Sequence, residues 1–224
     1  MEDFHDNVTS ILEVRDAAGC SSCIAASSLD GTVRTYDMRA GKCLTDSLGA
    51  PVGAIALSHD RNCILAALPS KSAAAATGGG GDLLLLERGG GSVLNRYSGS
   101  GHLHSVYRII PALTSTDSHV IAPSEDGNVR FFDLVDGKGG VARHSRFGVS
   151  ASPTPSSHLP PTPLPTGTTT ATLAAHKRAV SAVAVHPSPL HSILLTASFD
   201  GTAKLWTAGS ADNLREWVIA DSKD

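Results

Sequence analysis

Short runs of apolar residues recur along most of the chain, loosely alternating with polar or small residues and separated by turn-forming residues. Val8–Val14 and Thr202–Trp206 are two examples. A period of two places alternate side chains on opposite faces of a strand, whereas an amphipathic helix needs apolar residues three or four positions apart. Many short strands joined by turns predict an all-β fold.

The expected strands fall into four units, at about 6–48, 50–98, 101–142 and 173–208. The last stretch with a regular pattern, Asn213–Ile219, is expected to be either a closing strand or a short helix, within a C-terminal tail at 213–224. The individual strands are predicted at Val8–Val14, Ile24–Ser27, Thr32–Tyr36, from Cys43, at Val52–Leu57, Cys63–Leu68, Leu83–Leu86, Val106–Ile110, His119–Ala122, Val129–Phe132, near Val141, and at Val180–Val185, Ile193–Ala197 and Thr202–Trp206.

One sequence pattern occurs three times, as SSLDGTVRTYD, PSEDGNVRFFD and TASFDGTAKLW. In each copy an Asp-Gly pair precedes an aromatic residue by six positions, counted from the Asp, and a basic residue (Arg34, Arg130 or Lys204) stands two before the aromatic. Asp-Gly favours a tight hairpin turn because Gly tolerates positive φ and Asp can accept hydrogen bonds from its own backbone. The three copies predict an internal repeat built on a hairpin.

Two low-complexity segments interrupt the units. The Ala/Gly-rich insert at 69–82 stands where a hairpin turn is expected, and we interpret it as a flexible loop, since four alanines alone cannot nucleate a helix. The Pro/Ser/Thr-rich segment at 139–172 has almost no core-forming residues. It cannot bury enough apolar area to offset the entropy of ordering, so we expect it to be disordered.

Charge and composition narrow the class of protein. The chain of 224 residues has 18 Lys and Arg against 21 Asp and Glu, so direct binding to nucleic acid or to an anionic membrane is not expected. No apolar run reaches the length of about 20 residues needed to span a bilayer, and the polar N-terminus MEDFHDNVTS does not resemble a signal peptide. Four cysteines favour an intracellular compartment.

Motifs with chemical meaning are few. Cys20 and Cys23 form a C-x-x-C, but no second ligand pair at matching spacing follows for zinc, and the strand context does not suit a redox motif. Gly78–Gly81 is followed by Asp82, which does not match a phosphate-binding loop. The ten His are scattered, and no nucleophile motif accompanies them. We therefore expect no enzyme activity, no cofactor and no metal.

The repeats resemble those of WD-repeat β-propellers. His102 precedes Asp126 by the same number of residues as His176 precedes Asp200, and the turn Asp is followed by an aromatic residue in three units. The chain is similar to the C-terminal part of the mitogen-activated protein kinase organizer family. The segments that carry this resemblance are DNVTSILEV, SSLDGTVRTYDMRAGK, SHDRNC, GSGH and SHVIAPSEDGNVRFFDLVDG.

The resemblance implies a partial propeller segment over 1–212, with about four blades of four-stranded antiparallel sheet out of the seven of the family. About three N-terminal blades would then be absent, and Met1 would be an internal start, the product of a truncated gene model or the start of a genuine short form. Four blades alone would form an open arc with exposed edges, which invite self-association or completion in trans.

In the family, a His, a Ser or Thr, the turn Asp and a Trp form a hydrogen-bonded network within a blade. The resemblance places a complete tetrad in the last unit only. Partial tetrads remain at His102, Asp126 and Phe132 and at Asp30 and Tyr36. The complete set is His176, Thr196, Asp200 and Trp206.

The resemblance implies a non-enzymatic scaffold for protein partners, either kinase-pathway components or splicing factors of the spliceosome, in the cytoplasm and nucleus. The alternative is a structural subunit that completes a propeller in trans and has no signalling role. Ser152, Thr154 and Thr162 each precede Pro and are candidates for proline-directed phosphorylation, although such dipeptides are common in Pro-rich linkers.

Overall fold

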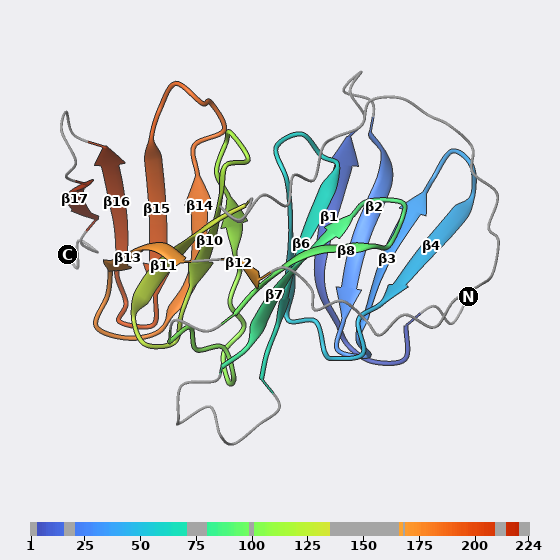
Figure 1. Cartoon of the computed structure of the whole chain (residues 1–224), viewed down its shortest axis with the longest axis horizontal. Helices are drawn as coiled ribbons and strands as arrows, with labels where there is room; N and C mark the ends of the chain where they lie inside the picture. Colours follow the sequence, from blue (N-terminus) through green and yellow to red (C-terminus); the bar gives the residue numbers. More distant parts are fainter. Residues whose placement is uncertain are drawn as a thin grey trace, which may run out of the picture.

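The computed structural model in Figure 1 contains β-strands as its regular elements. None of the residues that it describes forms a helix long and apolar enough to cross a bilayer. The described residues are 4–15, 21–70, 80–98, 101–134, 166–167, 169–208 and 214–219.

The strands form four sheets in chain order. The first contains β1 (Val8–Arg15), β2 (Ser21–Ser28), β3 (Thr32–Asp37) and β4 (Lys42–Ser47). The second contains β5 (Ala54–Leu57), β6 (Cys63–Leu68), β7 (Asp82–Glu87) and β8 (Val93–Tyr97), with the two-residue β12 (Thr166–Gly167) parallel to β8. The third contains β9 (Ala112–Leu113), β10 (His119–Pro123), β11 (Asn128–Asp133) and β13 (Thr169–Ala174). The fourth contains β14 (Val180–Val185), β15 (Ile193–Ser198), β16 (Ala203–Ala208) and β17 (Leu214–Ile219).

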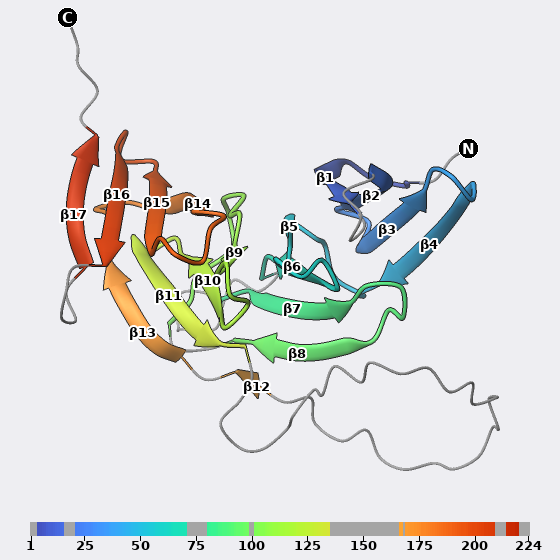
Figure 2. The ribbon, with the colours of Figure 1, turned by 90° about the horizontal axis from the view of Figure 1, so that it is seen from above.

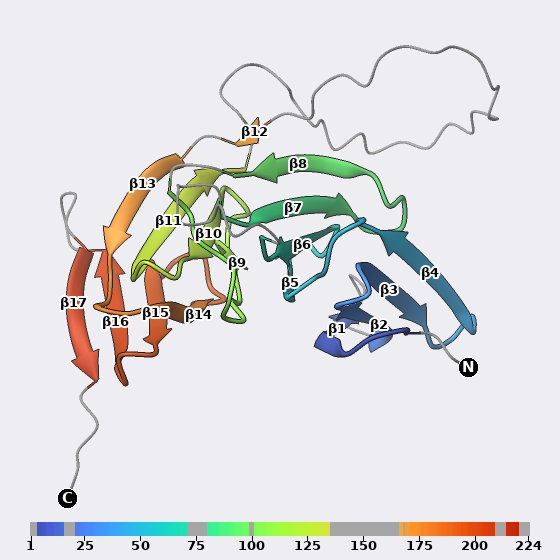
Figure 3. The ribbon, with the colours of Figure 1, turned by 90° about the horizontal axis from the view of Figure 1, so that it is seen from below.

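The sheets are blades of a β-propeller. Figures 2 and 3 show them following one another along an arc, with the β1–β4 sheet at one end and the β14–β17 sheet at the other. The innermost strands β1, β5, β9 and β14 lie in this order and contact one another in sequence. The prediction of an all-β fold with four blades of antiparallel sheet is confirmed.

Three apolar cores fill the spaces between successive sheets. β6 is buried along its whole length because alternate residues serve two cores: Leu65 packs with Phe132 toward the third sheet, and Ile64 packs with Val14 toward the first. A third core joins Val129 of the third sheet to Trp206 of the fourth. Stacking of sheets therefore supplies the burial that one sheet cannot achieve alone.

The fourth sheet presents its other face to no further sheet of the described chain. Leu195 and Leu205 are paired in register on that face, next to the pair Ala197 and Ala203. These four residues belong to none of the three cores, although each is only partly exposed. One end of the arc therefore has an apolar face.

The predicted Asp-Gly hairpins are present. Gly31, Gly127 and Gly201 have φ of 87°, 85° and 83°, the left-handed region that Gly adopts without steric cost. In each turn the Asp accepts a hydrogen bond from the backbone N–H two residues later, for example from Thr202 to Asp200 at 3.0 Å. The Ser two residues before the Asp closes the turn by accepting from the glycine N–H.

Four expectations need correction or completion. Val106–Ile110 is not a strand: β9 begins only at Ala112, because Glu125 accepts the N–H groups that a ladder would use. Within the segment 139–172, expected to be disordered, residues 166–167 form β12, which pairs with β8, and residues 169–172 belong to β13, which pairs with the edge of β11. Val141 lies outside the described residues, and β13 occupies the outer position expected near it. Of the two alternatives for Asn213–Ile219, the strand is correct for 214–219, and it pairs with β16.

Candidate interaction surface

One hydrogen-bonded chain crosses the fourth sheet and includes all four residues of the complete tetrad. His176 Nδ1 lies 3.0 Å from Asp200 Oδ2, and its Nε2 lies 2.7 Å from Thr196 Oγ1. The Trp206 indole N–H donates to the same hydroxyl oxygen at 3.0 Å. The network therefore ties the β15–β16 turn to the segment before β14 and fixes the Trp206 ring in the third core.

The charge on Asp200 orients this network. Burial raises the pKa of the carboxyl, but hydrogen bonds from Thr202, the Lys177 backbone and His176 outweigh that effect and hold the pKa well below its usual range. An ionised carboxylate only accepts, so a neutral His176 carries its proton on Nδ1 and accepts from Thr196 at Nε2. Every polar side-chain atom of this hydrogen-bonded network then has a partner. The network therefore has a structural role: it holds the blade in one conformation.

The third sheet uses a different network. His102 contacts the Pro123 carbonyl oxygen at 3.1 Å through Nε2. Asp126 instead receives two hydrogen bonds from Arg130, which is only 5% exposed, at 3.2 and 2.6 Å. Phe132 is fully buried and packs against Tyr97, with ring centroids 5.7 Å apart and ring planes tilted by 54°. Sequence reasoning missed the role of Arg130, although the basic residue two before each aromatic was the available signal.

The first sheet retains only parts of the pattern. Asp30 accepts from Thr32 and from the His5 backbone; burial raises the pKa of this carboxyl, but these hydrogen bonds and one from Ser28 lower it to about 2. Tyr36 contacts the edge of Phe4, and the Arg34 guanidinium lies 4.9 Å from the centre of the Phe4 ring. Here the turn Asp is reached by the backbone N–H of His5, at 3.0 Å, whereas in the fourth sheet it is reached by the imidazole of His176.

The segment before the third sheet also contains a pair of buried histidines, His102 and His104, which the sequence analysis did not predict. His102 and His104 are 2% and 1% exposed, and their ring centroids lie 6.4 Å apart. Nδ1 of each ring is buried without a hydrogen-bond partner. Burial lowers the pKa of both rings, to about 4 for His104. The sequence signal for the pair was the i, i+2 spacing of the two histidines in Gly101-His102-Leu103-His104. The repeat pattern drew attention only to His102.

Several candidates lie outside the described residues: Cys20, Ser152, Thr154 and Thr162. Within the described residues, no group of three or more His, Cys, Asp or Glu side chains comes together in a way that could hold a metal ion.

One group of exposed side chains lies where the β15–β16 turn meets the segment before β9. The Tyr107 and Phe199 rings lie 4.5 Å apart at 35°, and both are substantially exposed, at 41% and 46%. We call this group the turn-end patch. It consists of Val106, Tyr107, Arg108, Lys177, Arg178 and Phe199.

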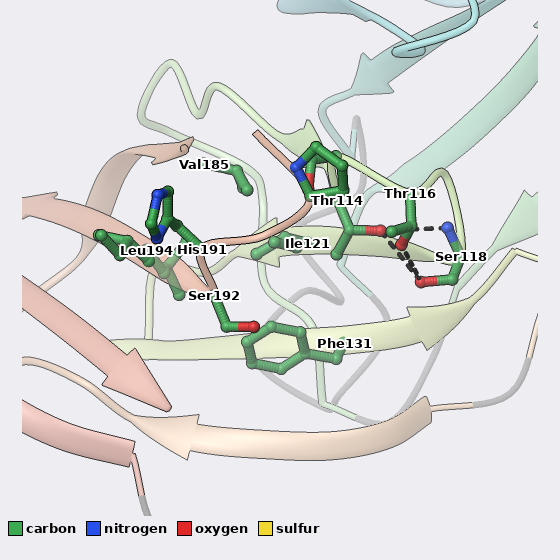
Figure 4. A pocket seen from close by; sticks show the side chains of 12 residues that line it. Thr114, Thr116, Ser118, Ile121, Phe131, Val185, His191, Ser192 and Leu194 are labelled. Carbon is green, nitrogen blue, oxygen red and sulfur yellow. Dashed lines mark hydrogen bonds between the residues drawn. The ribbon is translucent and has the colours of Figure 1, made fainter. Parts of the chain in front are cut away.

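The opposite end of the third and fourth sheets carries a hollow of about 290 Å³ (Figure 4). Ile121, Phe131 and Leu194 supply apolar walls. Hydroxyls of Thr114, Thr116 and Ser118, hydrogen-bonded to one another, form one side of the rim. This hollow is the gap between two adjacent blades, and the turn-end patch lies at the other end of the same two blades.

Comparison with known proteins is consistent with this geometry. Residues 167–207 match the family model described as "WD domain, G-beta repeat". This stretch runs from β12 through β13 to β16, so one sequence repeat supplies the outer strand of the third sheet and three strands of the fourth.

Relatives named "WD repeat domain-containing protein 83" match larger parts of the chain. The Xenopus tropicalis protein is 35% identical over 187 residues, which cover 84% of this chain and 45% of that protein. The rat protein is 37% identical over 114 residues, or 51% of this chain and 32% of that protein, and the human protein is 34% identical over 117 residues, or 52% and 33%. The chain therefore spans less than half the length of these relatives.

Among solved structures, the "computationally designed Ika4 protein" superposes with a TM-score of 0.58 at 15% identity, covering 93% of this chain and 96% of that chain. At this identity the likeness concerns the fold alone.

Proposed function

Because this chain is a WD-repeat β-propeller protein, we propose that it is a non-enzymatic scaffold that binds other proteins. WD-repeat propellers typically bind proteins, and rigid blades hold their connecting loops in fixed positions. The observation that carries the proposal is the turn-end patch, where exposed apolar side chains lie on a network of hydrogen bonds rather than on a loose loop.

The finer assignment rests on the resemblance to the mitogen-activated protein kinase organizer family. We propose that the partners are kinase-pathway components or splicing factors and that the chain acts in the cytoplasm and nucleus. A scaffold that holds two partners at once raises the effective concentration of each for the other. The similarity to proteins named "WD repeat domain-containing protein 83" supports grouping this chain with them. Their names state no partner, so the kind of partner rests on the family resemblance.

Affinity purification with quantitative mass spectrometry tests this function. The tagged full chain is compared with a Trp206→Ala variant, which lacks the residue that links the tetrad to the third core, and with the tag alone. We expect kinase-pathway components or splicing factors to be enriched with the chain and reduced with the variant. Equal recovery with the tag alone would contradict the scaffold function.

A second candidate function is that of a subunit completing a propeller in trans. The apolar outer face of the fourth sheet, with Leu195 and Leu205 outside the three cores, favours it. In the affinity purification, this second function would give a stoichiometric complex with one protein that contains further blades, and no kinase components.

A further inference from the structure

The turn-end patch combines exposure with order. Val106 is 78% exposed, a high value for an apolar side chain, and the adjacent Tyr107 stacks on Phe199 from the next blade. Such ring pairs contribute beyond the area that they bury, so both side chains are held in place. A clustered, ordered and exposed apolar group is typical of a protein-binding site.

Glu125 fixes the loop that carries Val106 and Tyr107. Its Oε1 accepts hydrogen bonds from the backbone N–H groups of Ser105, Val106 and Tyr107 at 2.6, 2.7 and 3.0 Å, and its Oε2 accepts from the Ser105 hydroxyl at 2.9 Å. Burial raises the pKa of Glu125, but these bonds lower it overall, so the carboxylate remains ionised and bound to the loop. The patch is therefore preorganised, which reduces the entropy lost on binding.

The backbone on the other side of the patch is equally constrained. The Lys177 N–H donates to Asp200 at 3.2 Å, the Ser198 hydroxyl donates to the Arg178 carbonyl oxygen at 3.1 Å, and the Phe199 N–H donates to the Ala179 carbonyl oxygen at 3.0 Å. The segment that contains Lys177 and Arg178 is thus hydrogen-bonded to the turn that contains Phe199.

The exposed charged side chains of the patch are all positive. Arg108, Lys177 and Arg178 are exposed at or next to it. Three carboxylates of the same two blades are engaged in hydrogen bonds: Glu125 with the 105–107 loop, Asp126 with Arg130, and Asp200 with His176 and Thr202. Among the residues that the structure describes, none of these three cations forms an ion pair, so their side chains are available to a partner, although the ionised Glu125 and Asp200 offset part of the local positive charge.

We propose that the turn-end patch binds an acidic segment of a partner protein that inserts an apolar or aromatic side chain beside Tyr107 and Phe199 and places carboxylates near Arg108, Lys177 and Arg178. The inference rests on the proposed scaffold function and names the chemistry of its partner. The two aromatic rings supply the apolar contact, and the three cations supply orientation and selectivity.

A protein segment fits the patch better than a nucleic acid does. The whole chain has a net charge of −3, which opposes the long-range attraction of a polyanion. Nucleic-acid grooves usually extend basic charge along a track of several phosphates, whereas the patch brings together only three cations. A short acidic segment needs only this local charge.

Selection from a phage-displayed library of short random peptides on the full chain tests the proposal. Enriched peptides are then synthesised with a fluorescein label, and their affinities are measured by fluorescence anisotropy. We expect them to carry an aromatic or leucine anchor flanked by Asp or Glu. The affinity should fall at least about tenfold in a Tyr107→Ser/Arg178→Glu variant, and it should also fall as ionic strength rises.

The β3–β4 turn, at the other end of the sheets, provides a matched control. Met38 is 66% exposed, and its neighbour Arg39 is exposed and basic, so a Met38→Ser/Arg39→Glu variant makes the same kind of change away from the patch. This variant should bind the peptides as the unchanged chain does. A Glu125→Gln variant should weaken binding to an intermediate extent because it loosens the loop and leaves every patch side chain in place.

Enrichment of neutral or basic peptides, no enrichment, or equal affinity for the chain and its Tyr107→Ser/Arg178→Glu variant would overturn the inference. Patch-dependent binding of a fluorescein-labelled oligouridine in place of peptides would also overturn it. Failure of the scaffold function is a separate result: it would be the absence of captured partners in cells. Partners captured equally by the patch variant would leave the scaffold standing and remove the patch as its binding site.

Discussion

At the scale of single residues, Thr196 shows how one small side chain can fix a blade. Its hydroxyl, which is fully buried, joins an imidazole from outside the sheet to the indole of the neighbouring strand. The equivalent position in the third sheet is Ala122, and there the turn carboxylate pairs with Arg130 instead. The same repeat position thus carries different chemistry in adjacent blades.

Replacing Thr196 by Val removes this hydroxyl and keeps the shape of the side chain. The Trp206 N–H and one nitrogen of His176 would lose their partner inside the protein, so we expect a loss of about 2 kcal/mol in the free energy of unfolding. Thr35→Val, at a buried position on β3 with no assigned hydrogen bond, should change it by less than about 0.5 kcal/mol. Urea unfolding measures both, and equal effects would contradict the network.

The buried histidine pair predicts a dependence of stability on pH. The pKa of His104 falls from 6.5 to about 4 on folding, mainly through burial, so the unfolded chain takes up the proton more readily. The contribution of neutral His104 to the free energy of unfolding is therefore fully present above pH 6.5. It is lost as the pH falls toward 4, and the total loss is about 3 kcal/mol. Thermal or urea unfolding between these pH values measures the decline.

His104→Leu should flatten that decline. The part that remains should come from His102, whose pKa burial also lowers, and near pH 4 from carboxyls such as Glu125 and Asp200, whose pKa values hydrogen bonds lower despite burial. An unchanged slope in His104→Leu would show that the ring is not buried in its neutral form.

At the scale of strands and turns, local signals predicted most of the elements. Asp-Gly hairpins and alternating apolar runs placed strands such as β3, β11 and β14 to within a few residues. The pattern failed at Val106–Ile110, because an apolar run there is held open by Glu125, a residue on a different strand connection. It also failed at β13, where Thr-rich sequence was interpreted as linker although Thr has a high strand propensity. In both cases the decisive partner is distant in sequence, which a local pattern cannot show.

The site shows the same limit. The tetrad at His176, Thr196, Asp200 and Trp206 followed from the family resemblance. The turn-end patch could not be found this way, because Tyr107 and Phe199 come from different blades and meet only when the blades stack.

The turn glycines provide a test at this scale, since two of them differ in surroundings but share their backbone angle. Gly127 and Gly201 have φ of 85° and 83°, so alanine at either would cost about 1–2 kcal/mol in backbone strain. A Cβ at Gly127 would also meet the His176 carbonyl oxygen, whereas a Cβ at Gly201 would meet nothing. Gly127→Ala should therefore lower the melting temperature more than Gly201→Ala, as differential scanning fluorimetry can measure. The reverse order would contradict the packing of the 176–178 segment on this turn.

At the scale of the whole molecule, each sheet depends on its neighbours, and the arc has two ends (Figures 2 and 3). The two ends differ in character: Ile11 is 67% exposed beside charged Glu13 and Arg34 on the outer face of the first sheet, whereas the outer face of the fourth is apolar at Leu195 and Leu205. A sheet face of this kind is stabilised by a covering partner.

The apolar end predicts association. At micromolar concentration the purified chain should sediment as a species larger than a monomer, and Leu205→Glu should shift it toward the monomer. Leu190→Glu, at an 87% exposed leucine in the β14–β15 loop, should not. A monomer with a cooperative thermal transition would contradict a need for a partner at this face. Analytical ultracentrifugation and a thermal melt provide the two readings.

The central claim is that this WD-repeat chain acts by binding proteins, and photo-crosslinking in cells tests it most directly. A photoreactive phenylalanine analogue placed at Tyr107 should give protein adducts whose crosslinked segments, identified by mass spectrometry, are rich in Asp and Glu. The same analogue at Leu190, which is exposed at the opposite end of the fourth sheet, should give few. No adducts at position 107, equal adducts at both positions, or adducts with RNA would contradict the account.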